Sequence, residues 1–228
     1  MDSGWNGTRD FEYDARGNVT TAGQLQFVYD RSEQPVAITG AANGIGSADG
    51  SYRYDGHFKR VKQEINGNTV YSVYDRAGVL VHIDAVTANE LTDYLVGPQG
   101  TLARIKNNDI TYLHPDILGS AQSGTDSSGA VQWREQYTPF GEELQSISAN
   151  DNQAGYTGHI RDAATGLNYM QARYYDPVIG RFYSNDPTGM CSTDADGNAV
   201  SGICPVPGDS KAEEIIHQQL SLEELKVL

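Results

Sequence analysis

Carboxylates, histidines and cysteines are the residues of this 228-residue chain that could do chemistry. The five histidines show no metal-ligand spacing, and the two cysteines, Cys191 and Cys204, form no Cys-x-x-Cys pair. The run Asp194-Ala195-Asp196-Gly197-Asn198 resembles a calcium loop, but it lacks the further acidic positions and the later glutamate that such a loop needs. The sequence also contains no phosphate-binding loop and no Gly-x-Ser-x-Gly motif. These residue types therefore predict neither a metal nor a cofactor.

Three aspartates toward the end of the chain remain as candidates for chemistry. Asp162 opens the sequence Asp-Ala-Ala-Thr-Gly, and Asp176 and Asp186 each precede a proline. All three could simply start turns, because an aspartate side chain can bond its own backbone two residues on. Arg173 and Arg181 could be structural partners of these carboxylates. Catalysis and turn formation stay equally open for Asp162 and Asp186, whereas a structural role is favoured for the other three.

The elements that must position these residues are short strands. The pair Tyr-Asp recurs in one setting, in which an alternating strand ends in Tyr-Asp, a short turn follows, and a second alternating strand leaves. The pairs are Tyr13-Asp14, Tyr29-Asp30, Tyr54-Asp55 and Tyr74-Asp75. The 25 glycines suit hairpin turns, and the 14 tyrosines suit half-buried strand faces.

Further hairpins follow at residues 65–69, which contain Asn-Gly, and at 94–102 and 124–133. A single hairpin cannot bury its apolar face, so neighbouring hairpins must pair side by side. We therefore predict an all-β fold of serial antiparallel hairpins forming a curved sheet. The alternative, a β-sandwich with chance Tyr-Asp pairs, is disfavoured by four recurrences in comparable contexts.

The composition changes near residue 190. Residues 191–210 are small, polar and broken by Pro and Gly, which is typical of a linker, and residues 211–228 predict a short C-terminal helix capped by Asp209-Ser210. No apolar run is long enough to span a bilayer, and the first residues lack a secretory signal. A net charge of −14 argues against binding to nucleic acid or to anionic membranes.

Several ordered motifs resemble one family. Residues 155–190 contain Tyr-Thr-Gly-His, Arg-Tyr-Tyr-Asp-Pro, Gly-Arg-Phe and Asp-Pro-x-Gly in the order of the core that closes the shell in Rhs and other YD-repeat proteins, including the C components of Tc toxins. Residues 114–120 and 137–141 resemble the family's "H-x-D-x-x-G-S" and "Y-x-P-F-G" signatures. With the Tyr-Asp units, the resemblance covers residues 11–190 and divides the chain into a YD-repeat segment (1–110), a core (111–190) and a variable tail (191–228).

The resemblance implies a hollow shell that encloses a C-terminal toxin passenger. The implied partners are that passenger or the rest of a parent shell, together with secretion-apparatus or immunity proteins. It also implies export by a bacterial secretion system. The alternative is a non-catalytic cell-surface module whose tyrosines bind carbohydrate. A toxin enzyme within residues 191–228 is a third reading, but that segment offers no nucleophile with a base and an orienting group.

In several family members the core is a single-turnover aspartyl autoprotease. By position, Asp162 and Asp186 match its carboxylate pair, and the implied cut lies between Met190 and Cys191. One carboxylate of such a pair is held protonated while the other activates water. Two features depart from the family: residues 146–159 lack an assisting arginine, and the Asp162 turn is one residue longer. Arg161, Arg173 or Arg181 could replace that arginine.

Overall fold

The computed structural model describes residues 10–42, 45–97, 100–145, 148–185, 192–193 and 199–201. The chain divides into one compact unit that ends at Asp186 and a second that starts at Pro187. The described part of the second unit is the hairpin of β18 (Ser192–Thr193) and β19 (Ala199–Ser201). The predicted helix at 211–228 lies outside the described residues.

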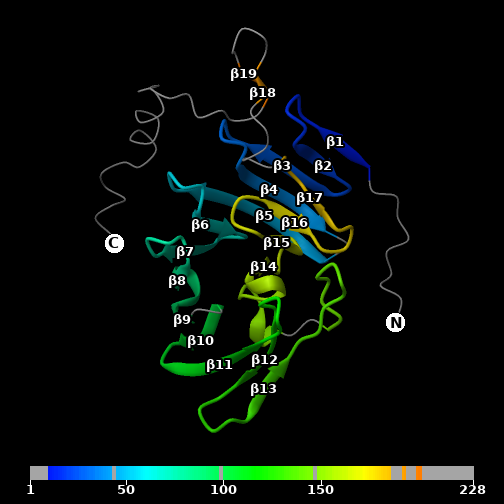
Figure 1. Cartoon of the computed structure of the whole chain (residues 1–228). Coiled ribbons are helices and arrows are strands. Elements are labelled where there is room, and N and C mark those ends of the chain that lie inside the picture. The colour runs from blue at the N-terminus through cyan, green and yellow to red at the C-terminus, as the bar shows by residue number, and fades with distance from the viewer. Residues whose placement is uncertain are drawn as a thin grey trace. The chain divides into compact units, whose positions relative to one another are not determined.

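The first unit contains two antiparallel sheets (Figure 1). We name the larger one the wall. Its 13 strands pair in strict chain order, as serial hairpins require: β1 (Phe11–Tyr13), β2 (Val19–Ala22), β3 (Leu25–Tyr29), β4 (Pro35–Ala42), β5 (Ile45–Tyr54), β6 (Arg60–Ile65), β7 (Asn68–Tyr74), β8 (Leu80–Ala85), β9 (Glu90–Gly97), β10 (Gly100–Lys106), β11 (Asp109–Pro115), β12 (Ala121–Thr125) and β13 (Val131–Arg134).

We name the smaller sheet the core sheet. It has four strands, β14 (Ile160–Asp162), β15 (Leu167–Tyr169), β16 (Tyr174–Asp176) and β17 (Arg181–Phe182). Short 3-10 helices complete the unit: η1 (Val86–Ala88), η2 (Ser148–Asn150) and η3 (Tyr156–Gly158). The prediction of an all-β fold of serial hairpins is confirmed.

Aspartates build the wall's turns in one repeated geometry. One carboxylate oxygen of each accepts hydrogen bonds from the backbone N–H groups two and four residues later. The residue three positions after the aspartate has positive φ. This turn occurs at Asp14, Asp30, Asp55, Asp75, Asp116 and Asp126. The repeat therefore has a local cause, because the side chain closes the turn before any tertiary contact forms.

The tyrosines of the third and fourth Tyr-Asp pairs tie their hairpins to the preceding ones. The Tyr54 hydroxyl donates to the Pro35 carbonyl at 2.8 Å, and the Tyr74 hydroxyl donates to the Arg60 carbonyl at 3.2 Å. In both cases the acceptor is five residues after the aspartate of the previous turn. The Tyr-Asp pair therefore serves two purposes: the aspartate makes the turn and the tyrosine sets the spacing to its neighbour.

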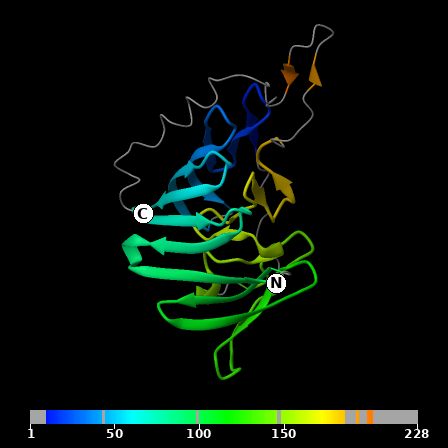
Figure 2. The ribbon, with the colours of Figure 1, turned by 60° about the vertical axis from the view of Figure 1, so that its left-hand side comes forward.

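The core sheet packs on one face of β2–β6, as Figure 2 shows for the yellow and blue strands. Leu167, Tyr169, Tyr174 and Tyr183 from the core sheet and the residue after it share a buried cluster with wall residues. Those wall residues are Val19, Ala22, Leu25, Phe27, Ile38, Tyr52 and Ile65. Burial of this apolar surface is the main force that holds core to wall.

Candidate functional site

Asp162 ends β14, and its side chain is fully buried against the wall. The turn that follows uses its backbone carbonyl, which accepts from the N–H groups of Thr165 and Gly166 at 3.1 and 2.8 Å. Its carboxylate instead accepts two bonds from Arg60, at 2.6 Å from Nη1 and 3.0 Å from Nη2. Asp162 therefore differs from the wall aspartates, whose side chains close their own turns.

Arg60 begins β6, 102 residues before its partner. Its guanidinium lies 4.2 Å from the centre of the Tyr169 ring and 5.5 and 5.8 Å from those of Tyr52 and Tyr174. Nη1 also donates to the Tyr174 hydroxyl at 2.8 Å. The side chains of Arg60 and Asp162 are 4% and 0% exposed, so this is a dry, bidentate ion pair inside an aromatic cage.

Electrostatics keep Arg60 charged in this cage. Burial alone would lower the pKa of Arg60, but the Asp162 carboxylate and the Tyr174 hydroxyl raise it well above its usual value. Burial also raises the pKa of Tyr174, which therefore stays a neutral donor and acceptor. Sequence reasoning did not find Arg60, because nothing near Asp162 in the chain points to a residue of β6.

The other candidate residues that the structure describes are Asp176, Arg173 and Arg181, and each has contacts other than the Arg60–Asp162 pair. Asp176 is buried and accepts from the Tyr183 hydroxyl at 2.6 Å and the Val178 N–H at 2.9 Å, which fits the expected turn-forming role. The Arg173 guanidinium lies 3.8 Å from the centre of the Phe182 ring. The Arg181 guanidinium lies 5.7 Å from the Phe11 ring of β1.

Asp186, Met190 and Cys191 lie outside the described residues, but the segment that leads to them is anchored. The Tyr183 carbonyl accepts from the Val19 N–H at 2.8 Å and from the Tyr29 hydroxyl at 3.0 Å. The Asn185 side chain donates to the Arg16 carbonyl in the first Asp turn. Tyr29 thus uses a core carbonyl where Tyr54 and Tyr74 use a wall carbonyl.

The core segment crosses the wall in reverse chain order. The Thr157 N–H donates to the Ser120 hydroxyl at 3.0 Å. Further on, the Gln34 side chain donates to the Ala172 carbonyl at 3.4 Å, and Tyr183 binds Val19. The chain therefore builds the wall from first hairpin to last and then returns across one face to the first hairpin.

A second buried polar cluster lies in the later half of the wall and was also missed by sequence reasoning. Arg104 of β10 donates to the Asn150 side-chain oxygen at 2.6 Å and to the Ala149 carbonyl at 2.7 Å. Asn150 in turn donates to Glu135 at 2.8 Å, and the Tyr137 hydroxyl donates to the same Glu135 oxygen at 2.5 Å. Arg104 also lies over the Trp133 ring, 5.6 Å from its centre.

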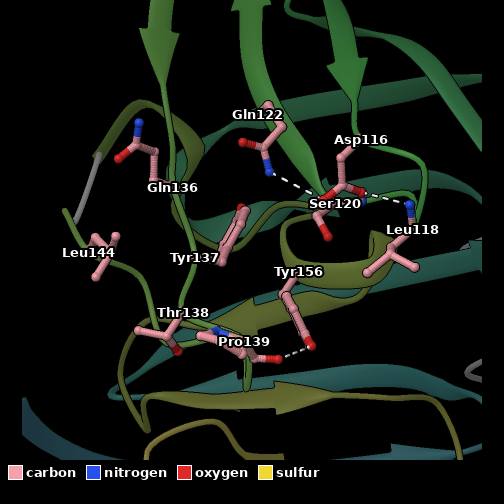
Figure 3. Close-up of a pocket in the computed structure, with 10 residues that line it drawn as sticks. All are labelled: Asp116, Leu118, Ser120, Gln122, Gln136, Tyr137, Thr138, Pro139, Leu144 and Tyr156. Atoms are coloured by element: carbon pink, nitrogen blue, oxygen red, sulfur yellow. Dashed lines mark hydrogen bonds between the residues drawn. The ribbon is translucent and has the colours of Figure 1, made fainter.

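The two sequence signatures at 114–120 and 137–141 line one pocket of about 450 Å³. Figure 3 shows Tyr137 in the middle of this pocket, with Asp116 and Leu118 on one side and Leu144 on the other. The signature at 137–141 also secures the core sheet, because the Phe140 carbonyl accepts from the Tyr175 hydroxyl at 2.9 Å. The signature at 137–141 therefore has a structural explanation, because it binds the core sheet through Phe140. The signature at 114–120 binds the start of the core segment through Ser120 and Thr157.

Among the described residues, no group of three or more His, Cys, Asp or Glu is arranged to hold a metal ion. No helix in the described part of the chain is long and apolar enough to cross a membrane. Three of the four tyrosines of the repeat are tied to the backbone, because the hydroxyls of Tyr29, Tyr54 and Tyr74 donate to backbone carbonyls, whereas Tyr13 is exposed.

A wall of hairpins paired in chain order, crossed on one face by a core segment that returns to the first hairpin, is the architecture of a YD-repeat shell. Residues 5–197 match the model of the Teneurin YD-shell family, and the chain belongs to that family. A Bacillus spizizenii protein named as a tRNA3(Ser)-specific nuclease WapA is 31% identical over 85% of this chain and 9% of its own length. The double-stranded DNA deaminase toxin A of Burkholderia cenocepacia is 28% identical over 82% of this chain and 14% of its own.

A solved structure shares the fold. The crystal structure of TcdB2-TccC3 superposes with a TM-score of 0.62 at 24% identity, covering 84% of this chain and 10% of that one. The chain thus spans a small fraction of the length of each relative. The expected relation to Rhs and Tc-toxin shell proteins is confirmed.

Proposed function

We propose that this chain forms a stretch of shell wall that encloses a C-terminal passenger and carries the core that holds it. The return of the core to the first hairpin carries this proposal. Because Tyr183 binds Val19 and Tyr29, and Asn185 binds Arg16 in the first Asp turn, residues 183–185 are held at a fixed point on the wall. Relatives named as a nuclease and a deaminase toxin support a toxic passenger.

The core also cuts its own backbone between Met190 and Cys191. Asp162 takes a proton from a water molecule, whose oxygen attacks the Met190 carbonyl carbon. Asp186 supplies a proton to the Cys191 nitrogen as the peptide bond breaks, leaving a carboxylate on Met190 and a free amine on Cys191. Cleavage in cis suits the anchored segment, since attachment to the wall removes the entropy cost of capturing a substrate.

Two observations support these roles. The Asp162 carboxylate is not used by its own turn, unlike those of the wall aspartates, and is held instead by the two bonds from Arg60. The anchor at Tyr183 to Asn185 limits how far the next few residues can reach. Arg173 and Arg181 remain candidates for stabilising the charge that develops on the attacked carbonyl.

Intact mass spectrometry of the purified chain tests this function. We expect wild type to split after Met190 and Asp186→Asn to stay whole. Asp126→Asn is the matched control, because it makes the same chemical change in an exposed wall turn, and it should split like wild type. A wild-type chain that stays whole for days would show that the aspartates are structural.

A further inference from the structure

The pocket of about 450 Å³ beside the two sequence signatures has features that folding alone does not explain. Four large apolar side chains in or next to the segments that line it are between 58% and 100% exposed, namely Ile117, Leu118, Phe140 and Leu144. Leu118 and Leu144 line the pocket itself, and Figure 3 shows them on opposite sides of it. Exposed apolar groups gathered around a hollow mark an interaction site.

We propose that this pocket binds an extended, uncharged peptide segment of a partner protein and takes up one leucine-sized side chain of that segment. This inference goes beyond the proposed function and does not require the backbone cut. Three properties of the lining select this partner: its charge, its amide groups and its aliphatic sides.

The lining presents one carboxylate and no cation. Asp116 uses both of its oxygens, because Oδ1 accepts from the Leu118 and Ser120 N–H groups at 2.8 Å and Oδ2 accepts from the Gln122 side chain at 3.4 Å. None of the ten lining residues, all of which the structure describes, is a lysine, arginine or histidine. In a chain with a net charge of −14, this hollow is suited to a neutral partner and not to a phosphate.

Two glutamine side chains supply polar groups that suit a peptide backbone. Gln122 and Gln136 line the pocket, and each amide carries donors and an acceptor, as a peptide unit does. The bond of Gln122 to Asp116 uses an N–H, so its oxygen can accept, and Gln136 is exposed. The N–H and C=O groups of an extended segment need such partners when the segment leaves water.

The apolar part of the lining suits an aliphatic side chain. The aromatic rings belong to the frame of the pocket: the Tyr156 hydroxyl donates to the Pro139 carbonyl at 2.9 Å, and the Tyr137 ring lies 5.8 Å from the Tyr156 ring. The exposed surface that a ligand can cover is therefore that of Leu118 and Leu144. A leucine-sized side chain between them would remove apolar area of all three from water.

The pocket is formed before any partner binds. The Thr138 N–H donates to the Glu142 carbonyl at 2.8 Å, and the Gly141 N–H donates to the Thr138 carbonyl at 2.9 Å, which closes the turn on one side. On the other side the Thr157 N–H donates to the Ser120 hydroxyl at 3.0 Å, which holds the start of the core segment. A preformed pocket loses little conformational freedom on binding, so even a short peptide should bind measurably.

The test is an NMR titration of the full chain, labelled with ¹⁵N, with two nine-residue peptides. Both consist of serine, glycine and threonine around one central residue, which is leucine in the first and aspartate in the second. Leu144→Asp changes the site. Leu102→Asp is the matched control, because Leu102 of β10 is a similarly exposed leucine, at 53%, and does not line the pocket. Circular dichroism checks that both variants fold.

We expect the leucine peptide to shift the side-chain amide signals of Gln122 and Gln136, with a dissociation constant of about 1 mM or lower. The aspartate peptide should bind at least about tenfold more weakly, because it takes a charge into an apolar hollow. Leu144→Asp should weaken binding of the leucine peptide by at least about tenfold, which is the loss expected when an apolar contact is removed. Leu102→Asp should bind it like wild type.

Unchanged glutamine signals with the leucine peptide would overturn the proposal. Equal binding of the two peptides, or equal weakening in the two leucine variants, would also overturn it, since the pocket would then select nothing. If the same signals move when the chain alone is diluted, a second copy occupies the pocket and the occupant is not a partner protein. The proposed shell function would survive each of these results, because intact mass measures it separately.

Discussion

The wall contains two buried arginines, Arg60 and Arg104, whose positive charges are compensated in different ways. Arg60 and Arg104 are 3% and 6% exposed, and each lies among aromatic rings. Arg60 faces a carboxylate directly, and its pKa is raised above the usual value despite burial. Arg104 faces an amide and a carbonyl, and burial lowers its pKa, with only partial compensation from Tyr94 and Glu135. The first arrangement is a closed ion pair, whereas the second spreads a charge over neutral acceptors.

The two arrangements also differ in what they contribute to stability. Replacing a buried ion pair by apolar residues is often neutral or stabilising, so a retained pair is weak evidence for stability alone. At Arg104, bonds to an amide oxygen and a backbone carbonyl fasten residues 149–150 to the wall, and Asn150 in turn donates to Glu135. The chemical role proposed for Asp162 would give one reason for a directly paired carboxylate at position 162.

The largest expected effect comes from breaking the ion pair. Asp162→Asn should lower the free energy of unfolding by about 3–5 kcal/mol, because it leaves the Arg60 charge buried without a counter-charge. Urea unfolding followed by tyrosine fluorescence measures this loss. The double variant Arg60→Met, Asp162→Asn should lose less than the sum of the two single variants, since it removes the uncompensated charge. Additive losses would mean that the two residues are energetically independent.

A smaller loss is expected at the second arginine. Arg104→Met should cost about 2 kcal/mol, because it leaves the Asn150 oxygen and the Ala149 carbonyl, both neutral, without their donor. The same unfolding measurement decides the order of the two sites. A loss as large as that of Asp162→Asn would contradict the view that Arg104 has no closely paired charge.

The wall was predictable from sequence because its turns are local. Each aspartate bonds to residues two and four positions away, so the aspartate closes the turn by itself, whether the third position holds Gly, as in four turns, or Glu33 or Phe58. The tyrosine spacing is similarly short, since Tyr54 and Tyr74 bind the hairpin just before their own. The core sheet could be placed only through the family resemblance of residues 155–190.

The partner of Asp162 was not predictable, for two physical reasons. Arg60 lies 102 residues away, and the pairing arises from the core's return across the wall. In addition, the pairing of β5 with β6 shifts between Arg53 and Tyr54, so that Tyr54 faces Arg60 while Arg53 faces Lys62. Such a bulge changes the direction of a side chain. In a regular strand Arg60 would lie on the same face as Lys62, two residues later. The cluster of Arg104, Asn150 and Glu135 was missed because its members are also far apart in the sequence.

The acid in the second cluster should respond to pH. Burial raises the pKa of Glu135 above its usual range, although bonds from Tyr137 and Asn150 and the charges of Arg104 and Arg161 oppose this. The folded state then binds the proton more tightly than the unfolded state. Stability from this group is fully present below the pKa of an unfolded glutamate, about 4.3, and is lost as pH rises through the higher folded value.

Glu135→Gln isolates that contribution, because glutamine keeps an oxygen to accept both bonds but does not titrate. Wild type should gain stability relative to Glu135→Gln as pH falls from 7 to 5. Urea midpoints across that range measure the difference. Parallel curves would show that Glu135 titrates alike in both states, and a gain toward higher pH would reverse the sign of the shift.

The smallest expected effect lies in the turn that delivers Arg60. Phe58 has φ of +61° at the turn position where Gly78 and Gly129 stand in two other turns. A residue with a Cβ pays roughly 1 kcal/mol for this conformation, so Phe58→Gly should raise the free energy of unfolding by up to that amount. Gly129→Ala is the reverse change in the later half of the wall, and its Cβ would meet no atom within 4 Å.

The two variants therefore separate backbone strain from contacts. Gly129→Ala should lose about 1 kcal/mol from its backbone alone, which calibrates the gain expected at Phe58. If Phe58→Gly instead loses stability while Gly129→Ala behaves as expected, the half-exposed phenylalanine contributes contacts worth more than its strain. In that case the packing contacts of Phe58 would outweigh the cost of its positive φ, and the surrounding residues would hold the turn in this conformation.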